Sequence, residues 1–379
     1  MRIIQVNYVY DDGVTDPDLW LERVPTLTGW SEALLAAGAS AVGVAQRFGR
    51  DAEVIRGGIR YVFRTDGGPG VPRAWRWTRS RALHQAVREG APDVVHVNGL
   101  AFRDRTAALR RELPASSALV LQDHGDLPRR RMWPFRRRGF VADALFFTSE
   151  AQAQPWREAG SIAREETVVA IPESGATMTP MAREGARRLT RIDGDPAVLW
   201  VGRLNRNKDP LTVVDGFARA AARLPRASLT MVFAAGELRT AVAARLAEQP
   251  ALAGRVRLVG RVPHERIAAF YSAADLFVLG SHHEGSGYAL LEAMACGVLP
   301  VVTDIPSFRA LTGGAGVLWR TGDAAACGDA IVDAARRATS GSREEIIARF
   351  EEHLSWPAVA RQAMHAYAEA LVGRSRRHY

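Results

Sequence analysis

The stretch ADLFVLGSHHEGSGYALLEAMACGVLPVV, residues 274–302, contains a short apolar run, a Gly-rich turn, a helical segment and a second apolar run. Residues 276–279 and 299–302 have the length and composition of buried strands. A strand that leads through a turn and a helix into another strand is the unit from which helix-covered parallel sheets are built. This stretch therefore predicts an α/β fold.

The same alternation of apolar runs and helical stretches continues on both sides of this unit. We expect strands in the first half at residues 2–7, 41–46, 60–63, 94–97, 118–122, 144–148 and 167–170. We expect strands in the second half at residues 197–201, 229–233, 256–258, 276–279, 299–302 and 316–319. Residues 172–195 are enriched in Pro, Gly, Ser and Thr, which places a domain boundary there. An amphipathic segment at residues 356–372 follows the last strand and is expected to pack back across the domain interface.

Length and composition limit the class of protein. A chain of 379 residues exceeds what one hydrophobic core usually supports, so two domains are expected. No apolar run approaches the roughly 20 residues that span a bilayer, and the N-terminus starts as a strand without the features of a signal peptide, so we expect a cytoplasmic protein. Two cysteines are too few for a disulfide framework or a zinc cage. The net charge of +9 suggests an anionic partner, but it does not choose among nucleotide, nucleic acid and membrane surface.

Lys208 is the only lysine in a chain with 50 Lys and Arg residues. It follows Arg203 in the loop after the expected strand at residues 197–201. A compact ammonium at one position, where every other cation is Arg, indicates a site at which a planar guanidinium does not substitute. Taken alone, both residues would be surface cations. Their position after a strand, however, is where the ligands of open α/β sheets collect.

The Gly285–Gly287 turn, which leads into a helix, is the second feature of this kind. Backbone N–H groups at a helix N-terminus, together with fixed cations, can neutralise a diphosphate. Glu292, about two helical turns beyond the glycines, is spaced to accept hydrogen bonds from a ribose diol, and Glu284 can meet sugar hydroxyls. An ordinary tight turn is the alternative for the glycines. The order of the cations, the turn and the carboxylates favours an anion and sugar site.

These residues resemble the retaining glycosyltransferases of the GT-B fold, in the group often called family 4. The most specific part is Glu284 with Glu292, an E-x7-E element, and the segment 293–302 after it. Residues 201–204 with Lys208 are similar to the diphosphate-binding loop of that family. Further motifs of the family are matched at residues 92–99, 122–126, 142–149, 274–281 and 355–356.

The resemblance implies two Rossmann-like domains that face a central cleft. Residues 1–172 are expected to form the acceptor-side domain, and residues 173–355 the nucleotide-sugar donor domain. Residues 356–379 are expected to form a helix that crosses back to the N-terminal domain. Transfer is implied to retain the anomeric configuration without a metal or other cofactor. It needs no dedicated protein base, because the leaving phosphate helps to deprotonate the acceptor.

The resemblance also implies roles for individual residues. The expected catalytic residues are Glu284, His124, Arg203 and Lys208. The expected donor-binding residues are Gly29, Arg203, Lys208, Glu284, Gly285, Ser286, Gly287, Tyr288 and Glu292. Among these, the two cations hold the diphosphate, Glu292 the ribose, and the amides of residues 285–288 the phosphate and sugar. Glu284 contacts the transferred sugar, which His124 approaches from the opposite domain.

Three stretches depart from the family pattern. The N-terminal donor loop, residues 27–30, has the single glycine Gly29 where the family usually has a pair. The segment that often reads Pro-Asn-Gly is Ile-Pro-Glu-Ser-Gly here, at residues 171–175. Residues 303–308 replace a common pair of glycines near the sugar. We expect the pocket to differ from that of the family at these stretches.

Some local patterns admit other interpretations. Residues 16–18 and 193–195 both spell D-x-D, which binds manganese in another glycosyltransferase fold, but acidic pairs around Pro or Gly are usually turn formers. Residues 282–284, His-His-Glu, lack metal-ligand spacing because adjacent side chains at a strand end point apart. We therefore expect no metal site. His96, at the end of an apolar strand, is expected to be structural or to line the pocket.

A basic run with interleaved aromatic residues follows His124. It includes Arg129, Arg130, Arg131, Trp133, Arg136, Arg137 and Arg138. Such a run can contact the head groups of an anionic membrane, or an acidic soluble acceptor. A solvated basic helix is the third interpretation. No nucleic-acid-binding module is recognisable, so nucleic acid is not an expected partner.

The hypothesis from the sequence is an enzyme that moves a sugar from a nucleotide diphosphate sugar to an unidentified acceptor: a glycan, a lipid-linked molecule or a small molecule. The expected location is the cytoplasm, with peripheral contact to the inner face of the membrane as an open alternative. A GT-B nucleotide-sugar epimerase is the second enzymatic hypothesis. A non-catalytic nucleotide-sugar sensor or a basic scaffold is the hypothesis from another class.

Overall fold

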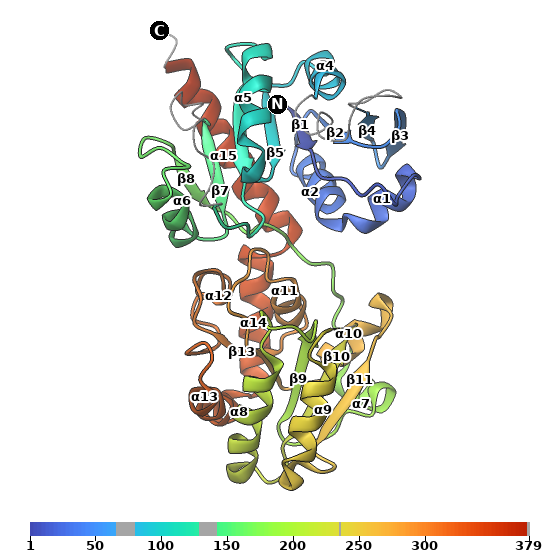
Figure 1. Cartoon of the computed structure of the whole chain (residues 1–379), viewed down its shortest axis with the longest axis vertical. Coiled ribbons are helices and arrows are strands. Elements are labelled where there is room, and N and C mark those ends of the chain that lie inside the picture. Colours follow the sequence, from blue (N-terminus) through green and yellow to red (C-terminus); the bar gives the residue numbers. More distant parts are fainter. Residues whose placement is uncertain (66–79, 129–141, 235, 377–379) are drawn as a thin grey trace. The chain divides into compact units, whose positions relative to one another are not determined.

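The first of two sheets in the computed structural model has eight strands, in the order β3-β4-β2-β1-β5-β6-β7-β8. They are β1 (Arg2–Asn7), β2 (Ala41–Arg47), β3 (Ala52–Arg56), β4 (Ile59–Arg64), β5 (Val94–Asn98), β6 (Ala118–Gln122), β7 (Ala144–Phe147) and β8 (Val168–Ala170). All neighbours are parallel except β3 and β4. The structure describes residues 1–65, 80–128, 142–234 and 236–376 (Figure 1).

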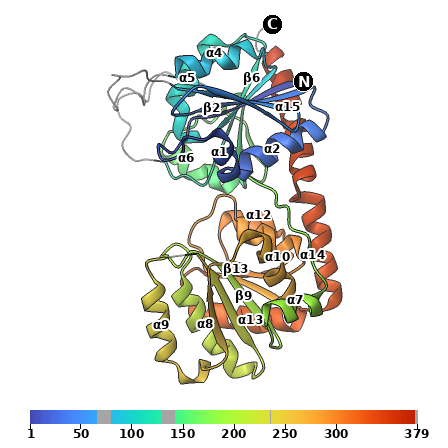
Figure 2. The ribbon, with the colours of Figure 1, turned by 90° about the vertical axis from the view of Figure 1, so that its right-hand side faces the viewer.

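Helices cover both faces of this sheet, because successive residues of each buried strand point to opposite sides. The helices are α1 (Pro17–Arg23), α2 (Pro25–Ala36), α4 (Arg81–Glu89), α5 (Arg103–Glu112), α6 (Gln154–Glu158) and α15 (Trp356–Arg376). Residues of α1, α2 and α15 share one core with Ile3 and Phe146. Residues of α4, α5 and α6 share the other core with Ile4 and Phe147. Figure 2 shows α2 and α15 on one side of the sheet and α5 on the other.

The second sheet has six strands in the order β11-β10-β9-β12-β13-β14, all parallel. They are β9 (Ala197–Gly202), β10 (Ser228–Phe233), β11 (Val256–Gly260), β12 (Leu276–Leu279), β13 (Leu299–Thr303) and β14 (Val317–Trp319). Its helices are α7 (Arg183–Thr190), α8 (Pro210–Arg223), α9 (Arg239–Ala247), α10 (His264–Ala273), α11 (Tyr288–Ala295), α12 (Pro306–Thr312), α13 (Ala324–Arg337) and α14 (Ser340–His353). The α/β prediction is thus confirmed.

The strand order reverses beside the first strand of each sheet. β1 lies between β2 and β5, and β9 lies between β10 and β12. Ligands of open parallel sheets bind at such a switch point, outside the carboxyl ends of the strands. The loops after β9 and β12, which contain Lys208 and Glu284, are therefore neighbours in space although they are far apart in sequence.

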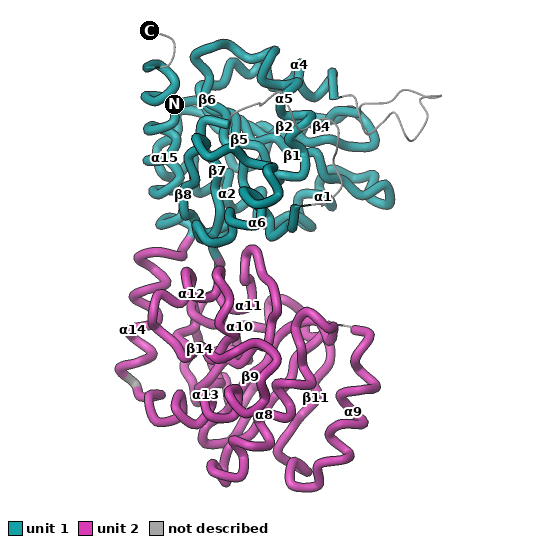
Figure 3. Tube along the Cα trace, turned by 60° about the vertical axis from the view of Figure 1, so that its left-hand side comes forward, with its two compact units in different colours: residues 1–175, 356–379 teal, residues 176–355 magenta. Residues whose placement is uncertain are grey.

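The chain divides into two compact units, each with one sheet (Figure 3). Unit 1 consists of Met1–Gly175 and Trp356–Tyr379, and unit 2 of Ala176–Ser355. The division falls after Gly175, whereas the sequence placed it after residue 172. The C-terminal helix α15 belongs to unit 1, so that unit is assembled from both ends of the chain.

β3 is the strand that the sequence analysis did not predict. It lies at the edge of the first sheet, pairs only with β4, and reaches it through a turn at Gly57 and Gly58, both with positive φ. Its side chains are exposed or half-buried, and Ile55 is 77% exposed. An edge strand of this kind buries no continuous apolar run, so the signal that identified the other strands is missing.

Helix α15 is held on unit 1 by polar contacts inside an apolar core. The Tyr367 hydroxyl accepts a hydrogen bond from Trp30 Nε1 at 3.3 Å and bonds Nδ1 of His96. His96 is completely buried, and burial, helped by the positive charge of His124, lowers its pKa to about 3. His96 is therefore a neutral core residue, as the structural interpretation expected.

Candidate functional site

Lys208 and Glu284 meet at the switch point of unit 2. Lys208 Nζ lies 2.6 Å from Glu284 Oε1, and the two side chains are 19% and 12% exposed. The only ammonium side chain of the protein is thus neutralised by the first carboxylate of the E-x7-E element. Arg203 lies exposed in the same loop after β9.

Asn207 fastens the two loops to each other. Its backbone carbonyl accepts from His282 N at 2.8 Å, its Oδ1 accepts from His283 N at 3.1 Å, and its Nδ2 donates to His283 O at 2.9 Å. Sequence reasoning missed this residue. The available signal was an amide side chain directly before the lone lysine in a strand-end loop.

Close backbone packing completes the junction. A Cβ on Gly280 would lie 3.0 Å from the carbonyl oxygen of Asp209 and 3.3 Å from that of Lys208. Asp209 has a φ of 40° and caps α8 by accepting from Thr212 N at 3.3 Å. Glycine at this position therefore lets β12 end close to the lysine loop without crowding these carbonyls.

The Gly-rich turn leads into α11 as expected. Gly287 has a φ of 61°, and a Cβ there would lie 2.8 Å from Leu311 Cδ1, so both backbone conformation and packing favour glycine. α11 begins at Tyr288, and its N-terminus carries the positive end of the helix dipole. Anion binding by residues 285–288 stays a prediction.

Glu292, on α11, is partnered by a tyrosine. Tyr271 is fully buried and donates its hydroxyl proton to Glu292 Oε2 at 2.9 Å, while His264 Nδ1 lies 4.0 Å from Oε1. Burial raises the pKa of Glu292, and the hydrogen bond from Tyr271 opposes that shift. Tyr271 also escaped sequence reasoning, because it lies on α10 and shares no motif with Glu292.

The end of β13 is tied to the same loops. Thr303 Oγ1 donates to the carbonyl of Ser281 at 2.6 Å. His282 Nε2 lies 3.1 Å from Asp209 Oδ2, whereas Glu284 turns to Lys208. His282 and Glu284, two residues apart, thus have separate partners.

His124 lies in unit 1, in the loop after β6. Its Nδ1 is 2.7 Å from Glu173 Oε1, and its Nε2 is 3.2 Å from Asn98 Oδ1. Burial lowers the pKa of His124, but Glu173, Asp123 and Asp126 together outweigh burial and raise it. Burial in turn raises the pKa of Asp123 to about 7, with a further contribution from Glu173.

Gly29 lies inside α2 rather than in a loop, and a Cβ there would be 2.7 Å from the indole of Trp356. The structure therefore corrects the expected loop to a helix and gives Gly29 a packing role, while its donor contact stays a prediction. The basic run from Arg129 to Arg138 lies outside the described residues.

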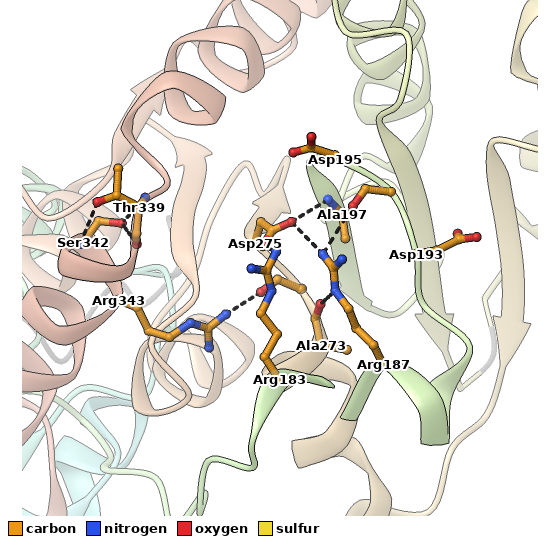
Figure 4. A network of polar contacts seen from close by, with 12 residues as sticks. Arg183, Arg187, Asp193, Asp195, Ala197, Ala273, Asp275, Thr339, Ser342 and Arg343 are labelled. Carbon is orange, nitrogen blue, oxygen red and sulfur yellow. Dashed lines mark hydrogen bonds and ion pairs between the residues drawn. The ribbon is translucent and has the colours of Figure 1, made fainter. Parts of the chain in front are cut away.

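The acidic pair at residues 193–195 lies at the opposite, amino-terminal edge of the second sheet (Figure 4). Asp195 accepts a hydrogen bond from Arg226. Nearby, Asp275 accepts from Arg183, from Arg187 at 2.9 Å and from Ala197 N at 2.8 Å. These contacts tie α7 to the strands and lie away from the edge that carries Lys208.

Two features are absent from the described part of the chain. No His, Cys, Asp and Glu side chains form a group of three or more that could hold a metal ion. No helix within the described ranges is long and apolar enough to cross a membrane.

Residues 195–337, which include Lys208, Glu284 and Glu292, match a family model described as glycosyl transferases group 1. This chain carries a group 1 glycosyltransferase domain. The domain begins at β9 and ends with α13, so it contains both loops of the switch point. The resemblance to glycosyltransferases is therefore confirmed, and sugar transfer is the activity that the comparisons support.

Curated relatives extend this likeness beyond the group 1 domain. The chain is 25% identical over 293 residues to a GDP-mannose:cellobiosyl-diphosphopolyprenol alpha-mannosyltransferase of Xanthomonas campestris, which covers 74% of each chain. It is 30% identical over 247 residues to a D-inositol 3-phosphate glycosyltransferase of Thermobispora bispora, which covers 61% of this chain and 57% of that one.

Solved structures agree on the fold of the whole chain. A glycosyltransferase from Rickettsia africae has a TM-score of 0.73 at 15% identity, covering 98% of each chain. Sucrose-phosphate synthase from Thermosynechococcus elongatus has a TM-score of 0.67 at 22% identity, covering 98% of this chain and 100% of that one. The protein has the GT-B fold.

Proposed function

We propose that the protein is a retaining, metal-independent glycosyltransferase that uses a nucleotide diphosphate sugar. The observation that carries the proposal is the 2.6 Å contact between Lys208 and Glu284 at the switch point of the group 1 domain. A diphosphate needs fixed cations and helix N-terminal amides. Lys208, Arg203 and the start of α11 supply these at one edge of one sheet.

The contact between Lys208 and Glu284 also suggests how the donor enters. A diphosphate would take Lys208 from Glu284, because it offers the ammonium more than one anionic oxygen. The carboxylate of Glu284 would then accept hydrogen bonds from the sugar. Charge stabilisation of the departing diphosphate by Lys208 and Arg203 would be the main catalytic effect.

Glu292 is proposed to bind the ribose. Its Oε2 is already held by Tyr271, which fixes the orientation of the carboxylate. A vicinal diol would donate to the remaining capacity of this carboxylate, and those hydrogen bonds would favour its charged form against the burial that raises its pKa. We assign unit 2 to the donor and unit 1 to the acceptor.

Known proteins support a nucleotide-sugar donor. An Anabaena protein with a TM-score of 0.66 was solved in complex with UDP, and an Escherichia coli protein with a TM-score of 0.60 was solved with UDP-2-fluoro glucose. Two relatives are named for acceptors that contain phosphate, a diphosphopolyprenol and an inositol phosphate. We therefore propose an anionic acceptor for a protein of net charge +9, with the lipid-linked class favoured and the cytoplasmic face of a membrane as its place of action.

The decisive experiment is a thermal-shift screen with UDP, GDP, ADP and their sugars, followed by a transfer assay with the donor that binds. A ligand at 100 times its dissociation constant is expected to stabilise the protein by about 2.7 kcal/mol. Turnover is expected to persist in EDTA. Loss of turnover in EDTA with recovery on addition of manganese would contradict the metal-independent mechanism.

The same assay separates the alternatives. An epimerase would convert the donor without any acceptor, and a sensor would bind it without turnover. Transfer to acceptor with the anomeric configuration kept supports the proposal. Inversion of the configuration in the product contradicts it.

A further inference from the structure

A directed chain of hydrogen bonds runs from α2 through β1 and the end of β5 to His124. It starts at the backbone carbonyl of Leu27, which can only accept. Ser31 Oγ donates to this carbonyl at 2.8 Å. The single hydroxyl proton of Ser31 is then used, so its oxygen accepts from Gln5 Nε2.

The donors and acceptors of the next two hydrogen bonds follow from these. Gln5 presents its Oε1 to Asn98, whose Nδ2 donates to it at 3.4 Å. The remaining oxygen of the Asn98 side chain, Oδ1, faces His124 Nε2 at 3.2 Å. An amide oxygen accepts only, and Nε2 of His124 must therefore carry a proton.

The other ring nitrogen faces a buried carboxyl group. Nδ1 lies 2.7 Å from Glu173 Oε1, and the side chain of Glu173 is 6% exposed, against 28% for His124. A buried carboxylate is stable only with a partner charge. With one acceptor at each nitrogen, both nitrogens of the ring are protonated when Glu173 is ionised.

The surrounding groups decide where the protons reside. The titratable groups that act on His124 are Glu173, Asp123 and Asp126. His96 lies nearby and is neutral, because burial lowers its pKa to about 3. Burial raises the pKa of the neighbouring Asp123 to about 7.

We propose that Glu173 is a positioning residue that holds His124 as an imidazolium, so that His124 acts on bound substrate as a fixed positive charge and never as a base. The catalytic part of this statement rests on the proposed function, whereas the charge state does not. An amide in place of the Glu173 carboxylate would not stabilise a cation in this way. The charge on His124 suits contact with an anionic or hydroxyl oxygen.

The charge state can be measured on the wild-type protein by NMR with 15N- and 13C-labelled histidine. The His124 signals are assigned by their loss in His124→Asn. At pH 7 both ring nitrogens are expected to show the shifts of protonated imidazolium, and the pKa of His124 is expected above the ordinary 6.5. A neutral ring with a single protonated nitrogen at pH 7 overturns the proposal.

Two variants then assign the effect to Glu173. Glu173→Gln is expected to lower the pKa of His124 by at least about one unit, a tenfold change in the protonation equilibrium, and Glu173→Asp to restore part of it. Asp126→Asn, which removes a neighbouring carboxylate on an exposed residue, is the matched control with a smaller shift. Equal shifts in Glu173→Gln and Asp126→Asn overturn the role of Glu173.

Activity provides an independent readout. If the cation is the working form, Glu173→Gln moves the alkaline limb of the kcat/KM profile to lower pH, because His124 then loses its proton earlier. If the alkaline limb stays in place although the pKa of His124 is lowered, the catalytic role of the cation is contradicted. The assignment of the charge state is then still supported. A protein that transfers no sugar at all refutes the proposed function, while the NMR result still decides the charge state.

Discussion

At the scale of single residues, the two carboxylates of the E-x7-E element have different environments. Glu284 is an anion that neutralises Lys208, whereas burial around Glu292 raises its pKa and a tyrosine donates to it. Both carboxylates belong to one sequence motif, but their partners come from the loop after β9 and from α10. Two charge-based predictions belong to this scale.

Glu284→Gln is expected to tighten the binding of nucleoside diphosphate, because Lys208 no longer has an anionic partner to leave. We expect about a fivefold lower dissociation constant, equivalent to about 1 kcal/mol, and weaker binding in Lys208→Ala. Calorimetry with UDP, GDP and ADP measures this directly. Glu265→Gln, which removes an exposed carboxylate of α10, is the control with unchanged affinity. Weaker binding in Glu284→Gln would contradict the exchange of partners.

Asp123 is expected to make unit 1 less stable as pH rises. Its carboxyl has an ordinary value of 3.8, and burial raises its pKa in the folded protein to about 7. Between these values the folded state keeps a proton that the unfolded state has lost, so the free energy of unfolding falls, by up to about 1.4 kcal/mol per pH unit. Urea denaturation at pH 5 and pH 7 should show a smaller fall in Asp123→Asn. Equal falls in both proteins would exclude this assignment.

At the scale of elements, the loops after β9 and β12 behave as one piece. Asn207 bonds the backbone of residues 282 and 283, and Gly280 lets the end of β12 approach the carbonyls of Lys208 and Asp209. The position of Lys208 therefore depends on contacts in which neither its ammonium group nor the Glu284 carboxylate takes part.

Gly280→Ala is expected to weaken nucleoside diphosphate binding while the fold persists. The new Cβ would lie 3.0 Å from the carbonyl oxygen of Asp209, so the lysine loop has to move away. We expect a destabilisation of about 1–3 kcal/mol, typical of overpacking, and a loss of affinity larger than stability alone explains. Gly185→Ala, in α7 with ordinary contacts, is the control. Full affinity in Gly280→Ala would show that the close approach is unimportant.

At the scale of the whole molecule, the two ends of the chain share one core. Val359, Ala363 and Tyr367 of α15 pack into the core that contains Trp30 of α2. In unit 2 the Asp275 network plays a comparable part, since it joins Arg183 and Arg187 to the start of β9. In each unit, therefore, buried or half-buried polar contacts hold one helix on the sheet: α15 in unit 1 and α7 in unit 2.

Tyr367→Phe is expected to destabilise unit 1 selectively. The variant removes a hydroxyl that bonds both His96 and Trp30, which leaves buried polar atoms without this partner and costs about 1–3 kcal/mol. Hydrogen exchange measured by mass spectrometry should show faster exchange in residues 1–175 and 356–376 than in the wild type, with unit 2 unchanged. Asp275→Asn should give the converse pattern, with faster exchange in unit 2. Uniform exchange changes in both variants would contradict separate units.

Local sequence was enough to predict the α/β class, the strands with buried apolar runs, and the turn that leads into α11. These features depend on local composition and period, which any short window of the chain contains. Lys208 was also identifiable alone, since it is the single ammonium side chain. The edge strand β3 was not, because its exposed side chains lack the apolar run.

Which of these features meet depends on how the whole chain folds. Lys208 reaches Glu284, 76 residues away, because the strand order places β12 beside β9, and strand order is not written in any local window. The same holds for Tyr271 on Glu292 and for Glu173 on His124. Gly29 was expected in a loop, but it lies in helix α2. Trp356, from the far end of the chain, packs against it there. Such contacts join residues that are far apart in sequence. They form only when the whole chain is folded, so no short stretch of sequence predicts them.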